Sequence, residues 1–214
     1  QLSSIVSGFV WRIGGADRYA TSAAIAKRTI ALLGGHYDGR LLVTTGANYP
    51  DAVGGAPLAA GLGWPIVLVP PTATTLVLPV GSNGAAILGG TSAVSDAFET
   101  FLEGTFGDVA VDRLGGDDRY DTSARVAQYG VDNGMVWDGV GIATGTNFPD
   151  SLAGGVALGL YRSVLLLTPG DALHPDAEAK LQANKADIKS VVILGGSAAV
   201  SDAVETKVNT ILGF

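Results

Sequence analysis

Residues 12–19 read RIGGADRY, and residues 113–120 read RLGGDDRY. Two further blocks recur in the same order. Residues 45–51 (TGANYPD) return as residues 144–150 (TGTNFPD), and residues 87–97 (ILGGTSAVSDA) return as residues 193–203 (ILGGSAAVSDA). Three ordered blocks indicate an internal repeat of about one hundred residues. We divide the chain into a first repeat, residues 1–112, and a second repeat, residues 113–214, with the boundary near Asp112.

Each repeat alternates short aliphatic runs with helical patterns. The runs are residues 9–13, 41–45, 65–69 and 85–88 in the first repeat, and 109–114, 140–144, 164–168 and 190–194 in the second. Such runs are typical of buried parallel strands. The alternation predicts an α/β fold with two tandem modules, each a mainly parallel sheet covered by helices. Residues 1–11 are assigned to the leading strand of the first repeat.

Helix starts are marked at matching positions in the two repeats. Asp and Ser side chains accept hydrogen bonds from the free N–H groups of a first helical turn, and Pro fits into that turn. The expected N-caps are Asp17, Ser95, Asp118 and Ser201, and the expected first-turn prolines are Pro50, Pro149 and Pro175. The helix that Pro175 opens is missing from the first repeat, where residues 71–86 suit a loop.

The overall composition excludes several classes of protein. The 214 residues carry 13 Lys and Arg against 20 Asp and Glu, a net charge of −7, and 47% are hydrophobic. This apolar content rules out intrinsic disorder. An acidic chain is poorly suited to nucleic acid, so no nucleic-acid partner is expected. The absence of Cys excludes disulfides and thiolate metal sites.

One uncharged stretch resembles a membrane span in its length. No charged residue occurs between Asp51 and Asp96, and residues 52–69 are long enough to cross a bilayer. Four glycines and two prolines interrupt this stretch, and its counterpart in the second repeat contains Arg162. We therefore expect no membrane span, but a buried helix ending near Gly63 and a strand after it.

Few residues suit catalysis. The two histidines, His36 and His174, occupy unrelated positions in the two repeats, and no Gly-x-Ser-x-Gly motif is present. A zinc site needs three or so ligands at helix or strand spacing, which the sequence does not supply. The Gly-Gly pairs lack the third Gly or the Lys of nucleotide-binding loops. We expect no catalytic residue, no metal site and no cofactor.

The repeated polar residues suit binding. Arg makes bidentate contacts with carboxylate or phosphate, and the two Asn follow strands, at the edge where open α/β sheets bind ligands. The candidate binding residues are Arg12, Arg18, Asn48, Arg113, Arg119 and Asn147. The alternative for each Arg is to support a loop by bonding a carbonyl or carboxylate, and for each Asn to form a turn. Both interpretations remain open.

Taken together, the blocks RIGGxDRYxTSA, GxN(Y/F)PD and ILGGxxAVS resemble the type 2 cell-wall-binding repeat of Gram-positive surface proteins, over nearly the whole chain. The resemblance implies a Toprim-like α/β module that anchors a secreted protein noncovalently to an anionic wall polymer, and therefore an extracellular location at the cell wall. Members usually carry three tandem copies around a pseudo-threefold axis. This chain has two, and the first lacks a surface helix.

The main interpretation is therefore a noncatalytic wall-anchoring module. Two alternatives remain: an assembly module that packs against further repeats, a second copy or protein partners, and a wall-glycan enzyme with a site between the repeats. A net charge of −7 repels an anionic polymer at long range. Binding would have to rely on local Arg and amide donors, or on a bridging divalent cation.

Overall fold

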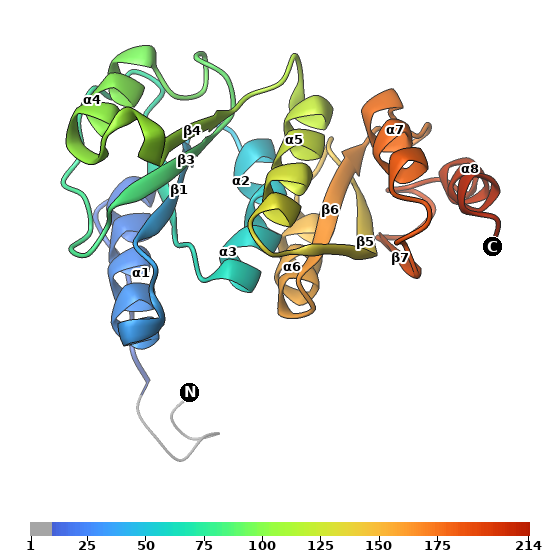
Figure 1. Ribbon diagram of the computed structural model, residues 1–214, viewed down its shortest axis with the longest axis horizontal. Coiled ribbons are helices and arrows are strands. Elements are labelled where there is room, and N and C mark those ends of the chain that lie inside the picture. The colour runs from blue at the N-terminus through green and yellow to red at the C-terminus, as the bar shows by residue number, and fades with distance from the viewer. Residues whose placement is uncertain (1–9) are drawn as a thin grey trace.

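Two parallel sheets form the framework of the molecule. The structure, a computed structural model, describes residues 10–214. In Figure 1 the first sheet lies on the left, with strand order β2-β1-β3-β4, and the second lies on the right, with order β6-β5-β7. Every strand pair is parallel. The predicted α/β fold with two helix-covered parallel sheets is confirmed.

The strands and helices follow the predicted alternation. The strands are β1 (Arg40–Thr45), β2 (Ile66–Val69), β3 (Gly84–Leu88), β4 (Val111–Leu114), β5 (Val136–Thr144), β6 (Ser163–Thr168) and β7 (Ser190–Leu194). The α-helices are α1 (Arg18–Leu33), α2 (Pro50–Gly54), α3 (Ala56–Leu62), α4 (Asp96–Phe106), α5 (Arg119–Asp132), α6 (Pro149–Leu160), α7 (Pro175–Ala183) and α8 (Asp202–Leu212). Short 3-10 turns occupy Gly34–His36 and Asp108–Ala110.

The fourth strand of the first sheet comes from the start of the second repeat. β4 pairs with β3 in the register Ala85 to Val111 through Leu88 to Leu114. The predicted boundary near Asp112 falls within this strand. The first sheet is therefore completed by residues that lead directly into α5 of the second repeat.

The described part of the leading segment of the first repeat, residues 10–13, is not a strand. Residues 1–9 lie outside the described residues, and residues 10–13 belong to no strand, although the aliphatic pattern predicts one there. The corresponding residues 111–114 form β4 because the preceding sheet offers them the edge of β3. In residues 10–214, the segment 10–13 pairs with neither of the two sheets.

The predicted helix starts are largely confirmed. Asp17 accepts a hydrogen bond from the N–H of Ala20, Asp118 from those of Tyr120 and Asp121, and Ser95 from that of Phe98. Ser201 precedes α8, but its hydroxyl makes no capping hydrogen bond among the described residues.

The predicted buried helix before Gly63 is divided into α2 and α3, whereas the second repeat has one helix, α6. Pro57 lies in the first turn of α3 and has no N–H to continue the hydrogen bonding of α2. Val156 takes the corresponding place within α6, so that helix continues unbroken.

One apolar core joins the two repeats. Leu58 of α3 and Leu88 of β3 belong to the same buried cluster as Val126 of α5 and Ile142 of β5. The helices α3 and α6 also lie side by side through small residues, because a Cβ added to Gly159 would lie 2.5 Å from the Cβ of Ala60. Close helix contact and a shared core fix the orientation of one sheet against the other.

The surface helix that the sequence predicts to be missing from the first repeat is absent between β2 and β3. Residues 70–83, between β2 and β3, contain no helix, whereas the second repeat has α7 between β6 and β7. None of the helices in residues 10–214 has both the length and the hydropathy that a bilayer crossing requires.

Candidate functional site

A cleft of about 280 Å³ opens where the two repeats meet. Four chain segments border it: the turn from β1 into α2, the segment after β2, the Gly-rich loop after β3, and the turn from β4 into α5. The strands of the first sheet end here, because parallel strands bring their carboxyl ends to one edge. We call this the junction cleft; it is lined by Thr45, Ala47, Asn48, Pro50, Asp51, Pro71, Gly90, Ser92, Ala93, Gly116, Asp117, Asp118, Arg119 and Thr122.

Two predicted binding residues meet in the junction cleft, one from each repeat. Arg119 begins α5, and its Nη1 donates to the carbonyl oxygen of Gly145 at 2.6 Å. This is its one hydrogen bond among residues 10–214, so the other guanidinium N–H groups remain available. Asn48 is exposed, and its Oδ1 accepts the N–H of Tyr49 at 2.9 Å. Its amide NH2 therefore remains available as a donor.

Asp51 is the unusual acid of the cleft. It lies in the first turn of α2, and Gly89 packs so closely against it that an added Cβ would lie 2.4 Å from Oδ2. Burial raises the pKa of Asp51 to about 6, and the nearby charge of Arg119 acts in the opposite direction. The carboxyl thus changes its charge close to neutral pH. With Asp117 and Asp118, the cleft holds three acids and one guanidinium.

A second hollow, of about 540 Å³, shares Asn48 with the junction cleft. Arg18, Tyr49 and Phe148 contribute to its lining. The rings of Tyr49 and Phe148 are 5.2 Å apart, and the hydroxyl of Tyr49 donates to the carbonyl of Thr146 at 2.7 Å. Arg18 Nη1 donates to Gly46 at 2.7 Å, which repeats the bond of Arg119 to Gly145. Asn48 therefore borders one hollow with Arg119 and another with Arg18.

Arg113 is engaged in loop support. Its Nε donates to Oε2 of Glu99 at 2.9 Å, and its Nη1 donates to the carbonyls of Gly89 and Val94 at 3.2 and 3.0 Å. The guanidinium holds the Gly-rich loop after β3 against the start of α4. This contact corresponds to the loop-supporting alternative that the sequence leaves open for Arg.

Like Arg113, two further predicted binding residues lie outside both hollows. Arg12 is exposed and makes no hydrogen bond or ion pair with residues 10–214. Asn147 is exposed, and its Oδ1 accepts the N–H of Phe148 at 2.9 Å, the same contact that Asn48 makes. Arg12, Arg113 and Asn147 are thus not brought together with Asn48 and Arg119.

The candidate binding residues predicted from the sequence include neither Asp51 nor the pair of Tyr49 and Phe148. The signal for Asp51 was its place in the repeated Pro-Asp, where a carboxylate near a helix start is ordinarily explained by the helix dipole. Its burial depends on Gly89 and on the second repeat, which a local pattern does not contain. The contact of Tyr49 with Phe148 joins matching residues of the two repeats and follows only from how the modules pack.

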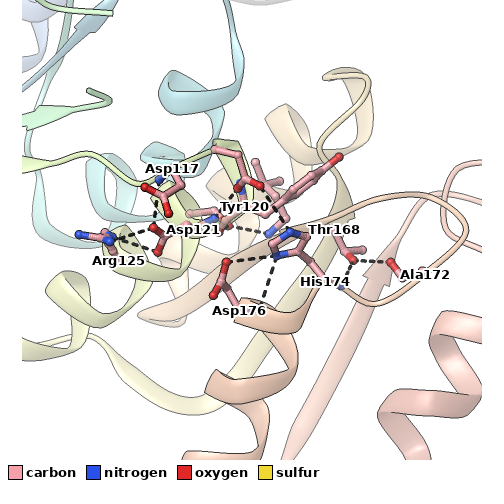
Figure 2. Close-up of polar contacts among 11 residues, drawn as sticks. Asp117, Tyr120, Asp121, Arg125, Thr168, Ala172, His174 and Asp176 are labelled. Carbon is pink, nitrogen blue, oxygen red and sulfur yellow. Dashed lines mark hydrogen bonds and ion pairs between the residues drawn. The ribbon is translucent and has the colours of Figure 1, made fainter. Parts of the chain in front are cut away.

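A cluster around His174 connects α5 with α7 (Figure 2). Its Nε2 lies 3.4 Å from Oδ2 of Asp118, its Nδ1 lies 3.3 Å from Oδ2 of Asp176, and its ring stacks on Tyr120 with centroids 4.6 Å apart. Nδ1 also accepts the N–H of Asp176 at 3.4 Å. One potential ligand atom from each of Asp118, His174 and Asp176 lies within 4.8 Å of the other two, although the sequence predicts no metal site. The contacts of His174 with Asp118 and Tyr120 attach the start of α7 to the start of α5.

Comparisons with known proteins agree with this architecture. The sequence profile of cell wall binding domain 2 matches residues 12–99 and 113–205. Among curated proteins of Bacillus subtilis strain 168, the chain is 27% identical over 209 residues to the N-acetylmuramoyl-L-alanine amidase LytC and 30% identical over 199 residues to the amidase enhancer. These matches cover 94% and 92% of the chain, but only 38% and 26% of the two relatives.

Two solved structures share the fold. Cwp6 from Clostridium difficile superposes with a TM-score of 0.77 at 21% identity, covering 93% of this chain and 31% of Cwp6. Cwp8 from the same organism superposes with a TM-score of 0.74 at 23% identity, covering 94% of this chain and 33% of Cwp8. With two profile matches that take in both of its repeats, the chain belongs to the cell wall binding domain 2 family.

Proposed function

We propose that this chain is a noncatalytic module that binds an anionic cell-wall polymer in the junction cleft, and that it works outside the cell as the wall anchor of a secreted protein. The observation that carries the proposal is the meeting of Arg119 and Asn48 from different repeats at one edge of the first sheet. Free guanidinium and amide N–H groups there can donate to phosphate or carboxylate oxygens.

The charges of the cleft favour short-range recognition over long-range attraction. Asp51, Asp117 and Asp118 accompany a single Arg, and the whole chain carries −7. An anionic polymer gains affinity from hydrogen bonds to Arg119 and Asn48, and loses it by approaching ionised acids. Protonation of Asp51, or a divalent cation between the exposed acids and the polymer, would reduce that repulsion.

The contents of the cleft support binding rather than turnover. Its lining contains no His and no Cys, and the one acid with a shifted pKa, Asp51, has Gly89 packed against it. A glycan hydrolase needs two carboxyl groups placed on either side of a bond. Asp117 and Asp118 are exposed and Asp118 caps α5, so neither is held in such an arrangement.

Sedimentation with purified cell walls tests the proposal. Wild-type protein should sediment with intact walls and stay in solution with walls stripped of anionic polymer. The double variant Arg18→Ala with Arg119→Ala should stay in solution with both, while circular dichroism shows that it remains folded. Arg125→Ala is the matched control, because Arg125 is exposed on α5 and its hydrogen bonds within residues 10–214 go to Asp121 alone.

Retained sedimentation of the folded double variant would remove these arginines from the binding site. Release of the wild-type protein by a chelator would assign binding to a bridging cation instead. An assembly role is the second candidate function, and the observation that favours it is the open edge of β7.

A further inference from the structure

The second sheet has an open edge at the position where β4 closes the first. In the first sheet, β3 lies between β1 and β4, and all five of its residues are buried. β7 occupies the corresponding place in the second sheet, pairs on one side only, and has no buried residue. Val192 is 51% exposed, whereas its counterpart Ala86 is 0% exposed. An aliphatic strand with one unpaired edge is an acceptor for another strand.

The groove beside β7 repeats the receptor for Arg113. In the first repeat, that receptor consists of Glu99 and the carbonyls of Gly89 and Val94. The corresponding residues, Glu205, Gly195 and Val200, all line a groove of about 300 Å³, which we call the edge groove. Glu205 is exposed and forms no ion pair with any of residues 10–214. The remaining residues that line the edge groove are Val191, Ile193, Ser197, Asp202, Val208, Asn209 and Phe214.

Residues 10–15 match the sequence of β4 but lie in no strand among the described residues; we call them the donor segment. Residues 10–15 read VWRIGG, and residues 111–116, which enter the first sheet, read VDRLGG. In the donor segment Val10 is 55% exposed and Ile13 is 44% exposed. Arg12, which corresponds to Arg113, is exposed and unpaired among the described residues.

We propose that residues 10–15 of one copy of this chain add to β7 of a second copy as a parallel fourth strand, with Arg12 paired to Glu205. The contact is between molecules, because the start of α1 and the edge of β7 lie at opposite ends of the chain in Figure 1. By the register of β4 on β3, Val10 lies opposite Val191 and Ile13 opposite Leu194. This inference does not depend on the proposed wall ligand.

Two neighbouring features fit the same docking. Gly115 approaches the loop after β3 so closely that an added Cβ would lie 2.9 Å from the Cα of Gly90, whereas at Gly14 an added Cβ meets nothing within 4 Å. Because Gly14 has no side chain and open space around it, the backbone of another chain could approach it as closely as Gly90 approaches Gly115. Ile25 on α1 is 48% exposed, whereas its counterpart Val126 is 0% exposed against the shared core. Docking would offer Ile25 similar cover.

The association is head to tail, since the two surfaces differ. It also has a consequence for the ligand site. In the junction cleft, Gly116 to Arg119 form one wall opposite Asn48 and Asp51. Docking would bring residues 15–18 of the incoming copy to the same position opposite Asn147 and Asp150, and so build a second cleft between the two molecules.

A charge exchange between two variants tests the pairing. The wild-type chain should gain mass with concentration in sedimentation velocity. Arg12→Glu alone and Glu205→Arg alone should each weaken self-association at least about tenfold, because each places like charges together in the groove. An equimolar mixture of the two should associate again, since each donor segment then meets a groove of opposite charge.

Glycine variants provide the second test. Gly14→Ala should weaken self-association at least about tenfold without changing the melting temperature. The matched control, Gly35→Ala, is at another open position and should associate as the wild type does. A wild-type chain that stays monomeric at millimolar concentration would overturn the proposal. So would association that none of the variants changes, which would assign the contact to another surface.

Discussion

The Nε of Arg113 lies 2.9 Å from Oε2 of Glu99, and this ion pair joins the first residue of the second repeat to a helix of the first. Both side chains are largely enclosed, with 16% and 23% of their surface exposed. The same guanidinium donates to two loop carbonyls. One residue therefore supports β4, α4 and the Gly-rich loop together.

Replacing Arg113 should destabilise the whole chain. We expect Arg113→Ala to lower the free energy of unfolding by about 2–3 kcal/mol, because it leaves Glu99 and two carbonyls without their donor. Chemical denaturation measures the loss. Arg12→Ala, at the matching exposed position, is the control and should change stability by less than about 0.5 kcal/mol. Equal losses from the two variants would contradict the structural role of Arg113.

Gly89 should not tolerate a side chain. Its φ is +107°, and an added Cβ would lie 2.4 Å from Oδ2 of Asp51. Gly89→Ala should therefore cost about 2 kcal/mol or more, from backbone strain and from displacement of Asp51. The neighbouring Gly90 has a negative φ or an extended backbone, and an added Cβ there meets nothing within 4 Å, so Gly90→Ala should cost much less. Thermal unfolding of the pair provides the comparison.

The stability of the chain should fall as the pH rises through the range in which Asp51 titrates. The pKa of this carboxyl is raised from 3.8 to about 6 by burial, so between these values the folded chain holds a proton that the unfolded chain has lost. Asp51→Asn should remove this dependence and raise the free energy of unfolding at pH 7 by about 1–2 kcal/mol.

The control for this experiment is Asp150→Asn, at the matching exposed position of the second repeat. Urea unfolding between pH 4 and pH 7 gives the comparison, with Arg119, Asp117 and Asp118 as the charged groups around Asp51. A wild-type profile that rises across this range and is unchanged in Asp51→Asn would contradict the assigned pKa.

Wall binding should also depend on Asp51. Below pH 6 its carboxyl is largely neutral, so an anionic polymer meets less repulsion in the junction cleft. We expect a tighter interaction with intact walls at pH 5 than at pH 7.5, and a smaller change in Asp51→Asn. The measurement is the bound fraction at increasing wall concentration. Tighter binding by the wild type at the higher pH would argue against contact of the polymer with this cleft.

The local elements were predictable because their causes are local. The aliphatic run 41–45 became β1 within one residue, and Asp118 caps α5 through hydrogen bonds to residues two and three positions away. The break at Pro57 was not predicted, although its cause is also local, since Val156 takes the corresponding place in the second repeat. What the sequence did not reveal was the partner of each strand. Residues 10–13 have the composition of a strand, but a strand also needs an edge.

The candidate site was predictable only in part for a related reason. Repetition identified Arg119 and Asn48, and the structure brings them together in one cleft. Repetition gave Arg12 and Arg113 equal standing, yet Arg113 is enclosed by the first repeat and Arg12 is exposed. Arg113 and Arg12 differ in burial because only Arg113 follows a sheet within the described residues, and a motif shared by both repeats does not contain this information. Asp51 owes its raised pKa to enclosure by both repeats in the same way.

The placement of β4 has a consequence for how such arrays grow. The sequence repeat and the folded sheet do not have the same boundaries. β4 lies at the start of the second repeat in the sequence, but it completes the sheet of the first repeat. Lengthening the gene by one unit would therefore create no new kind of boundary. Each added unit would contact its neighbour through the same pairing of a leading strand with the preceding sheet. Only the first leading segment and the last sheet of the array would be without such a partner.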